Sequence, residues 1–267
     1  MFQLKEFVQP KTLDEAYTLM KKSPRNVVLG GTTFLRLSEA MFHTGIDLSL
    51  LDVHTIIEDE KSFELGAYVT YGDICRCKAL SHFADGILPD AISHIIGTQF
   101  RNHVTVGASV FSRYGFSDFL PPLLVLDTEV ELYHQGRLPL EDFLNSPIEK
   151  DILTKIIIKK EAVEAVYETY RQSSADFPLV NVALSKKGAN YKVAFGARPQ
   201  RGVLARKVMD GLNQLGFSKE TWPQIEELVK EESLFKKNDR ASAAYREQLG
   251  INLLKRSLCR LEGEDEF

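Results

Sequence analysis

Cysteine is scarce in this chain: 267 residues contain only Cys75, Cys77 and Cys259. So few thiols, and an odd number of them, build no disulfide framework and suit a reducing compartment. An iron–sulfur cluster normally takes four cysteine ligands, so this chain cannot hold one alone. Cys75 and Cys77 with His82 are candidate metal ligands, but they lack the number and spacing of a complete site. Structural thiols are the alternative interpretation.

Long apolar runs and an excess of basic residues are also missing. The longest apolar runs, such as residues 123–126 and 156–158, are far shorter than the ~20 residues that span a bilayer. Lys5 and Glu6 stand where a secretory signal would need an apolar core, so we expect a cytoplasmic protein. The 33 Lys and Arg against 37 Asp and Glu give a net charge of −4, with no general attraction to nucleic-acid phosphates. We therefore expect neither a membrane span nor a nucleic-acid partner.

Common catalytic and nucleotide-binding motifs do not occur. There is no G-x-G-x-x-G after a strand and no G-x-x-x-x-G-K-[ST], which excludes a Rossmann fingerprint and a P-loop. The histidines form no H-E-x-x-H and no triad-like spacing. The sequence therefore predicts no catalytic acid or base and no metal site.

Periodicity predicts short alternating elements in the first part of the chain. Apolar residues recur at helical spacing over residues 12–22, with Thr12 as the candidate N-cap. Residues 26–29 predict a strand that leads through a glycine turn into a helical segment, residues 34–40. Residues 98–112 are too polar for a core segment and are predicted to form a loop that needs a functional explanation.

The pattern changes near residue 163. Strands are predicted at residues 152–160, 165–171, 178–185 and 191–195, and helices at residues 203–215, 220–232 and 240–261. Short alternating elements, followed by a run of strands and then a run of helices, predict an α+β protein of two domains, residues 1–163 and 164–267.

Two glycine-bearing segments could approach a phosphate. In Gly30-Gly31-Thr32 the missing Cβ atoms let the backbone come close and present successive N–H groups before a helical segment. Thr105-Val106-Gly107-Ala108-Ser109 offers hydroxyl and N–H groups to the same kind of ligand. An ordinary tight turn remains the alternative for each segment alone.

In this order and with these neighbours, the segments resemble the FAD-binding (medium) subunit of the molybdenum hydroxylase family, of the xanthine dehydrogenase and carbon monoxide dehydrogenase flavoprotein type. VVLGGTTF at residues 27–34 resembles the family's V-x-G-G-T-x-L, and residues 65–74 resemble its next element. RNHVTVGAS at 101–109 and SDFLPPLLVL at 117–126 are similar to R-N-x-G-T-I-G-G-N and S-D-x-x-P-x-L-L-A-L. NDRASAAYR at 238–246 resembles its R-x-S-A-x-Y-R helix start.

The resemblance implies an α+β fold: a two-subdomain FAD-binding domain of the vanillyl-alcohol-oxidase-like type, then a smaller C-terminal domain of sheet and helices. It implies FAD as the cofactor. The two glycine-bearing segments would hold its pyrophosphate, and Asp118 would bind elsewhere along it, with a plain helix cap as the alternative. Leu153 and Arg171 are weaker candidates, for which a buried strand leucine and a solvated arginine are the alternatives. The implied cofactor-binding residues are Val27, Val28, Leu29, Gly30, Gly31, Thr32, Thr33, Phe34, Thr105, Val106, Gly107, Ala108, Ser109, Asp118, Leu153 and Arg171.

By resemblance, electrons from a substrate reach this chain's FAD through 2Fe-2S clusters and pass to NAD or another acceptor. An iron–sulfur subunit and a large molybdopterin-binding subunit are the implied partners. Residues 141–144 and 152–159 look closest to members that hydroxylate purines or other N-heterocycles. The alternatives are a structural subunit without flavin and a free-standing flavin oxidase. Departures from the family pattern at Val104, Ala108, Ser109 and residues 113–115 motivate the first, since a Cβ at position 108 would be strained if φ were positive.

Overall fold

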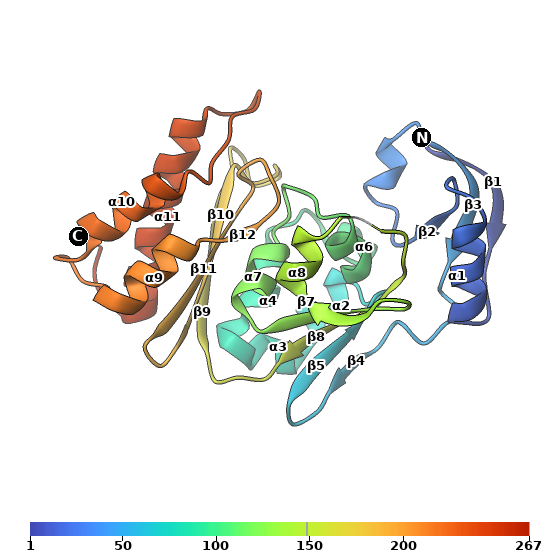
Figure 1. Cartoon of the computed structure of the whole chain (residues 1–267), viewed down its shortest axis with the longest axis horizontal. Helices are drawn as coiled ribbons and strands as arrows, with labels where there is room; N and C mark the ends of the chain where they lie inside the picture. The colour runs from blue at the N-terminus through green and yellow to red at the C-terminus, as the bar shows by residue number, and fades with distance from the viewer. Residues whose placement is uncertain (148, 267) are drawn as a thin grey trace. The chain divides into compact units, whose positions relative to one another are not determined.

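The computed structural model describes residues 1–147 and 149–266, which form two compact units (Figure 1). The first unit comprises Met1–Arg76, Gly97–Ser112 and Thr128–Lys160. The second comprises Cys77–Ile96, Arg113–Asp127 and Glu161–Phe267. The units are interleaved along the chain. The boundary predicted near residue 163 concerns sequence domains and stays a prediction.

The first unit begins with a three-stranded parallel sheet in the order β1-β3-β2, beside helix α1. Thr12 caps α1 as predicted, since its Oγ1 accepts from the Glu15 N–H at 3.1 Å. At the other end of the helix, the Lys150 ammonium donates to the Ser23 carbonyl at 2.7 Å. The bounds are β1 (Gln3–Val8), α1 (Leu13–Lys22), β2 (Val27–Leu29) and β3 (Met41–Asp47).

A five-stranded antiparallel sheet, in the order β4-β5-β8-β6-β7, forms the rest of the first unit. Short helices surround it, and α6 packs on β5 and β8. The bounds are β4 (Ile56–Glu58), β5 (Ser62–Gly66), α2 (Tyr71–Arg76), α5 (Thr98–Arg101), α6 (Val106–Phe111), β6 (Thr128–Leu132), β7 (Gly136–Pro139), α8 (Leu140–Asn145) and β8 (Leu153–Lys159).

Two predictions in this unit were wrong in part. The stretch 98–112 is not a continuous loop, because α5 and α6 lie within it. Val106 and Val110, four residues apart, are both fully buried and anchor α6, although polar neighbours hide this spacing in the sequence. The helix predicted at residues 34–40 is only a single 3₁₀ turn, η1 (Leu35–Leu37).

The second unit is built on a four-stranded antiparallel sheet in the order β12-β11-β10-β9. Helices α9 and α11 contact one face of this sheet, and α10 packs on these two helices. Helices α4 and α7 contact the other face (Figure 1). Residues 203–204, predicted as helix, are strand β12, so that helix begins at Arg206. The bounds are α3 (Lys78–His82), η2 (Phe83–Gly86), α4 (Ile87–Ser93), α7 (Leu120–Val125), β9 (Glu164–Tyr170), β10 (Val180–Lys187), β11 (Asn190–Gly196), β12 (Val203–Leu204), α9 (Arg206–Leu215), α10 (Trp222–Glu232) and α11 (Ala243–Glu262).

Arg246, near the start of α11, is a buried charge that fastens this helix to the sheet. Its side chain is 1% exposed. The guanidinium donates to the carbonyls of Leu179 and Ala197, the latter at 2.9 Å, and to Asn238 Oδ1 at 2.5 Å. Hydrogen bonds from a charged donor are stronger than neutral ones, and burial makes them costly to lose. One side chain thus joins the chain before β10, the chain after β11 and the start of α11.

Within residues 1–147 and 149–266, none of the helices combines the length and the apolar character needed to cross a membrane.

Replacing Arg246 with alanine is expected to lower the free energy of unfolding by about 3 kcal/mol, because two buried carbonyls and an amide oxygen lose their donor. Denaturant unfolding followed by circular dichroism measures the change. The matched control is Arg256→Ala on the same helix, where the side chain is 52% exposed and its ion pairs are superficial. An equal loss in both variants would contradict the fastening role of Arg246.

Candidate functional site

The glycine turn after β2 presents open backbone donors. Among the described residues, no group accepts a hydrogen bond from the N–H groups of residues 31–33. Thr32 has φ 53°, in the left-handed region that one residue of an anion-binding nest adopts. A turn of this kind with open N–H groups on successive residues is suited to phosphate oxygens.

This turn lies directly against the backbone between α5 and α6. A Cβ added to Gly31 would stand 1.3 Å from the His103 carbonyl oxygen, so only glycine fits there. A Cβ on Gly30 would stand 2.7 Å from both Thr105 Oγ1 and Ala108 Cβ. The structure therefore brings together the two glycine-bearing segments that the sequence singled out.

The second segment contributes fewer donors than its place at a helix start suggests. The N–H groups of Val106 and Gly107 already donate to the carbonyls of Val69 and Ala67, each at 2.9 Å. The Ala108 N–H donates to none of the described residues. Thr105 is 5% exposed, and its buried hydroxyl oxygen has no partner in the described part of the chain. An unsatisfied hydroxyl and an open amide beside the nest fit a ligand with several acceptor oxygens.

Ala108, where the family has glycine, is not strained. It lies inside α6 and is not among the residues with positive φ. Its Cβ lies 2.7 Å from the position that a Cβ on Gly30 would take, so it occupies space that the glycine leaves open. The departure at this position therefore carries no conformational penalty of the kind that a positive φ would impose.

Tyr68 holds the end of β2 at the beginning of the turn. Its phenol donates to the Leu29 carbonyl and accepts from the Leu48 N–H at 2.8 Å. Asp47 Oδ1 lies 3.1 Å from the same oxygen. Burial, with the neighbouring carboxylate, raises the pKa of Tyr68 well above its usual value, so the phenol keeps its proton. Sequence reasoning did not select Tyr68 as a site residue, because its partner lies 39 residues away.

A second group of predicted residues meets within the other unit. Asp118 is 4% exposed, and its Oδ1 lies 2.5 Å from the Arg171 guanidinium and 2.5 Å from the Tyr167 hydroxyl. The alternative of a helix cap is excluded, since Ser117 Oγ accepts from the N–H groups before and at the start of α7, those of Phe119 and Leu120. The alternative of a solvated arginine is also excluded, because the Arg171 side chain is 8% exposed.

Leu153 belongs to neither group. It lies in β8 opposite Leu132 of β6 and is 5% exposed. Its side chain is thus part of the packing of the five-stranded sheet. The interpretation as a buried strand leucine accounts for everything that the structure shows of it.

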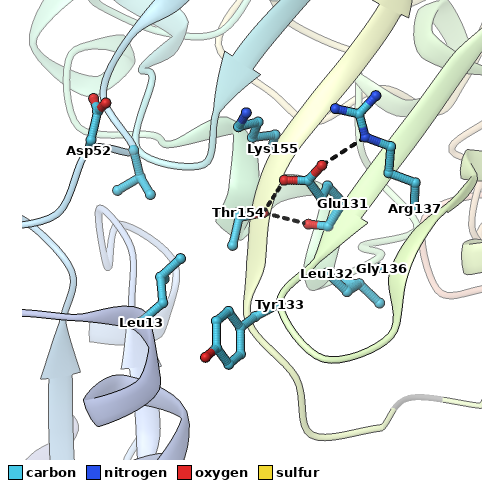
Figure 2. A pocket seen from close by; sticks show the side chains of 10 residues that line it. Leu13, Asp52, Glu131, Leu132, Tyr133, Gly136, Arg137, Thr154 and Lys155 are labelled. Carbon is cyan, nitrogen blue, oxygen red and sulfur yellow. Dashed lines mark hydrogen bonds and ion pairs between the residues drawn. The ribbon is translucent and has the colours of Figure 1, made fainter.

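A pocket of about 270 Å³ opens elsewhere in the first unit, lined by α1 and the β6, β7 and β8 strands among others (Figure 2). Three of the four charged side chains in its lining form ion pairs, and Glu131 meets Arg137 at 2.8 Å. Thr154 donates to the Glu131 carbonyl at 3.0 Å. Lys155 pairs with Glu64 at 2.8 Å. The predicted cofactor residues do not line it, so we assign it no ligand.

The described residues contain no cluster of three or more His, Cys, Asp or Glu side chains suited to a metal ion. Cys75, Cys77 and Cys259 are free thiols. Cys259 is buried and Cys77 half-buried, as expected for structural thiols, whereas Cys75 is exposed.

Comparisons with known proteins agree with this architecture. The reconstituted CO dehydrogenase from Oligotropha carboxidovorans superposes with a TM-score of 0.88 at 18% identity, over 98% of this chain and 99% of that one. Quinoline 2-oxidoreductase from Pseudomonas putida 86 gives 0.85 at 17%, over 98% and 97%. The uncharacterized protein YgfM of Escherichia coli K12 is 26% identical over 185 residues, which are 68% of this chain and 70% of YgfM. The structural likenesses confirm the α+β fold.

Two family descriptions match nearly the whole chain. "FAD binding domain in molybdopterin dehydrogenase" covers residues 1–160, and "CO dehydrogenase flavoprotein C-terminal domain" covers residues 165–261. Their order is that of a flavoprotein subunit, and the open amide nest lies within the first of them. The chain therefore belongs to the family of FAD-binding flavoprotein subunits of molybdopterin dehydrogenases, a family of oxidoreductase components.

Proposed function

We propose that this chain is the electron-transferring FAD subunit of a molybdenum-containing hydroxylase or dehydrogenase. The observation that carries the proposal is the nest of open N–H groups at residues 31–33, set against the buried, unpartnered Thr105 hydroxyl and the open Ala108 amide. These donors suit a pyrophosphate, the part of FAD that backbone amides can hold without positive side chains. FAD, once bound, supplies the ability to take electrons singly and deliver them as a pair.

The residues are assigned as follows. Residues 27–34 and 105–109 hold the pyrophosphate, with Tyr68 keeping the end of β2 in place. Asp118 and Arg171 bind elsewhere along the cofactor, and their ion pair at 2.5 Å brings these two predicted residues together. Leu153 contributes at most an apolar surface. The protein places the flavin and needs no acid or base of its own for the redox step.

The finer assignments rest on the resemblance and on the relatives. We propose iron–sulfur and molybdopterin-binding subunits as partners, a purine or other N-heterocycle as substrate, NAD as one acceptor, the cytoplasm as location and a domain boundary near residue 163. The relative named quinoline 2-oxidoreductase supports the choice of an N-heterocycle. Co-purification of partner chains with a tagged copy tests the assembly, and reoxidation of the reduced flavin by NAD⁺ tests the acceptor.

A flavin-free structural subunit is the second candidate. It is favoured by the departures from the family pattern at Val104, Ala108 and Ser109. Two observations count against it. Ala108 has an ordinary helical backbone, and the Ser109 hydroxyl donates to the Thr105 carbonyl at 2.9 Å, so both residues fit α6 without closing the nest. We therefore retain flavin binding as the proposal.

The purified chain is expected to show the absorption bands of bound flavin near 450 nm, or to acquire them on addition of FAD. Equilibrium dialysis against FAD gives the stoichiometry, with one FAD per chain expected. A colourless protein that takes up no FAD would favour the structural subunit instead.

Changing Gly31 to alanine is expected to weaken FAD binding at least about 100-fold, because a Cβ there collides with the His103 carbonyl and separates the two segments. Fluorescence titration with FAD measures the affinity. Gly202→Ala is the matched control, since a Cβ at Gly202 meets only ordinary contacts at 3.5 Å or more. An affinity within threefold of wild type for Gly31→Ala would contradict the assigned site.

Ala108→Gly is expected to leave the FAD affinity within about threefold of wild type while lowering the free energy of unfolding by about 1 kcal/mol, the cost of glycine inside a helix. The physical reason is that Ala108 is unstrained and faces Gly30. Titration and thermal unfolding of the same preparation give both values. A tenfold gain in affinity would instead show that the alanine Cβ hinders the ligand.

A further inference from the structure

Three arginines gather where two connections of the second unit meet. Arg113 lies in the connection between α6 and α7, and Arg198 and Arg201 lie in the connection between β11 and β12. The two connections are in direct contact, since a Cβ added to Gly115 would stand 2.6 Å from the Pro199 carbonyl oxygen. Packing within one unit therefore brings together basic residues that are more than 80 positions apart in the sequence.

Arg198 is held in place with one amino group left available. Its Nε donates to the Arg201 carbonyl at 3.0 Å, and its Nη1 donates to the Leu234 carbonyl. Among the described residues, no group accepts a hydrogen bond from Nη2, and no carboxylate pairs with this guanidinium. Nη2 is not among the fully buried atoms without a partner, so a ligand can reach it. Two backbone carbonyls thus fix a donor whose remaining N–H groups point to no acceptor of the described chain.

The positive charges of the three arginines act on each other. Burial, together with the charge of Arg201, lowers the pKa of Arg113 and that of Arg198, although both side chains stay protonated. Both are half-buried, so water screens their charges less than it screens those of a surface arginine. For Arg198, which pairs with no described carboxylate, a bound anion would offset the cost of burial and the repulsion together.

Arg113 has a backbone conformation that is unfavourable for an arginine. Its φ is 50°, in the left-handed region, which strains a residue that carries a Cβ. Strained residues of this kind are concentrated at functional sites. Residues 113–115 also depart from the family pattern, which has small residues and a proline there. The flavin-binding segments therefore give no reason for an arginine at this position.

Two lysines extend the positive charge around the arginines. Lys236 and Lys237 follow soon after Leu234, and the Lys236 N–H donates to the Arg198 carbonyl at 2.7 Å. Both lysines are exposed, and neither forms an ion pair with a described residue. The whole chain has a net charge of −4, so this collection of basic residues runs against its overall charge. Such a local concentration of positive charge attracts anions.

We propose that Arg113, Arg198 and Arg201 form a binding site for the phosphate group of a small molecule. A guanidinium presents several N–H donors in a plane that matches two phosphate oxygens, so three of them can surround one tetrahedral anion. A small anion reaches half-buried side chains, whereas a flat acidic protein surface would meet only the exposed Arg201 and the lysines. None of these residues belongs to the nest at residues 31–33, so the inference stands apart from the proposed flavin function.

Aromatic rings beside Arg113 distinguish two sources of the phosphate group. Tyr114 stacks on Phe116 with ring centroids 5.0 Å apart, and the Phe116 centroid lies 4.4 Å from that of Phe177. Phe177 is 47% exposed, and an exposed ring can stack on a nucleobase. A nucleoside monophosphate that binds more tightly than inorganic phosphate would identify a nucleotide as the ligand. Equal affinities would mean that the site recognises the phosphate group alone.

The test is calorimetric titration of the full chain with inorganic phosphate and with adenosine monophosphate. Arg113→Asn and Arg201→Gln are each expected to raise the phosphate Kd at least about tenfold, because each removes a charged donor. Asparagine tolerates the left-handed region, so Arg113→Asn removes the charge without adding strain. Arg256→Gln is the matched control, since it removes the same charge from a 52% exposed side chain of α11 and is expected to leave the Kd unchanged.

Two further measurements separate this site from folding and from the nest. Thermal unfolding of each variant without phosphate reports its stability, and Arg201→Gln alone carries the test if Arg113→Asn fails to fold, because Arg201 is exposed. The phosphate titration is then repeated with saturating FAD. Phosphate at the three arginines is expected to stay bound, whereas phosphate at residues 31–33 would be displaced by the FAD pyrophosphate.

Three results would overturn the phosphate site. They are no saturable binding of either probe by the wild type, the same Kd in the arginine variants as in Arg256→Gln, and loss of bound phosphate when FAD is added. A wild type that binds no FAD contradicts the proposed function only, because the comparison of the arginine variants needs no flavin.

Discussion

The rest of the site depends on one close approach, that of Gly31 to the carbonyl oxygen of His103. Two peptide segments more than 70 residues apart can pack at this distance only where a side chain is absent. This packing also limits the size of the residues next to Gly31. Gly30 must stay small because Thr105 and Ala108 lie against it, and the N–H groups of residues 31–33 have no acceptor among the described residues. These open donors are therefore a consequence of packing, and the phosphate binding that we propose for them needs no positive side chain.

Buried charge organises the second unit. Arg246 and Arg240, both from the signature at residues 238–246, donate hydrogen bonds to residues 176–179, which belong to the same connection between β9 and β10 as Arg171. Desolvating the guanidinium groups of Arg171 and Arg246 is costly, and each cost is offset by carbonyl or carboxylate acceptors at hydrogen-bonding distance. The motif that the sequence identifies as a helix start thus holds, in the structure, the connection whose Asp176 carbonyl binds Arg171.

Patterns among neighbouring residues predicted much of this structure. The elements and contacts that they missed depend on exposure at a sheet edge or on residues far away in the sequence. The Thr12 cap, the C-terminal sheet and the two glycine segments follow from neighbouring residues and were found. Strand β1 was missed because Gln3, Lys5, Glu6 and Phe7 are all exposed at a sheet edge and show no apolar alternation. Helix α6 was missed because tertiary hydrogen bonds to Val69 and Ala67 stabilise six residues with little propensity of their own. Tyr68 and Tyr167 act on partners 39 and 49 residues away, a relation that no local pattern contains.

The interleaving of the two units bears on how such a protein can evolve and be dissected. Helix α7, whose six residues are all buried, covers one face of the sheet formed by β10 and β11, yet it is encoded within the part of the chain that the FAD-binding family description covers. Ser185 of β10 even donates to the Val125 carbonyl of this helix at 2.7 Å. A gene fragment that starts after residue 163 would lack that cover and expose an apolar sheet face to water. The two family domains follow each other in the sequence, whereas the two compact units interleave, so recombination that exchanges one family domain must preserve the surface of a helix belonging to the other.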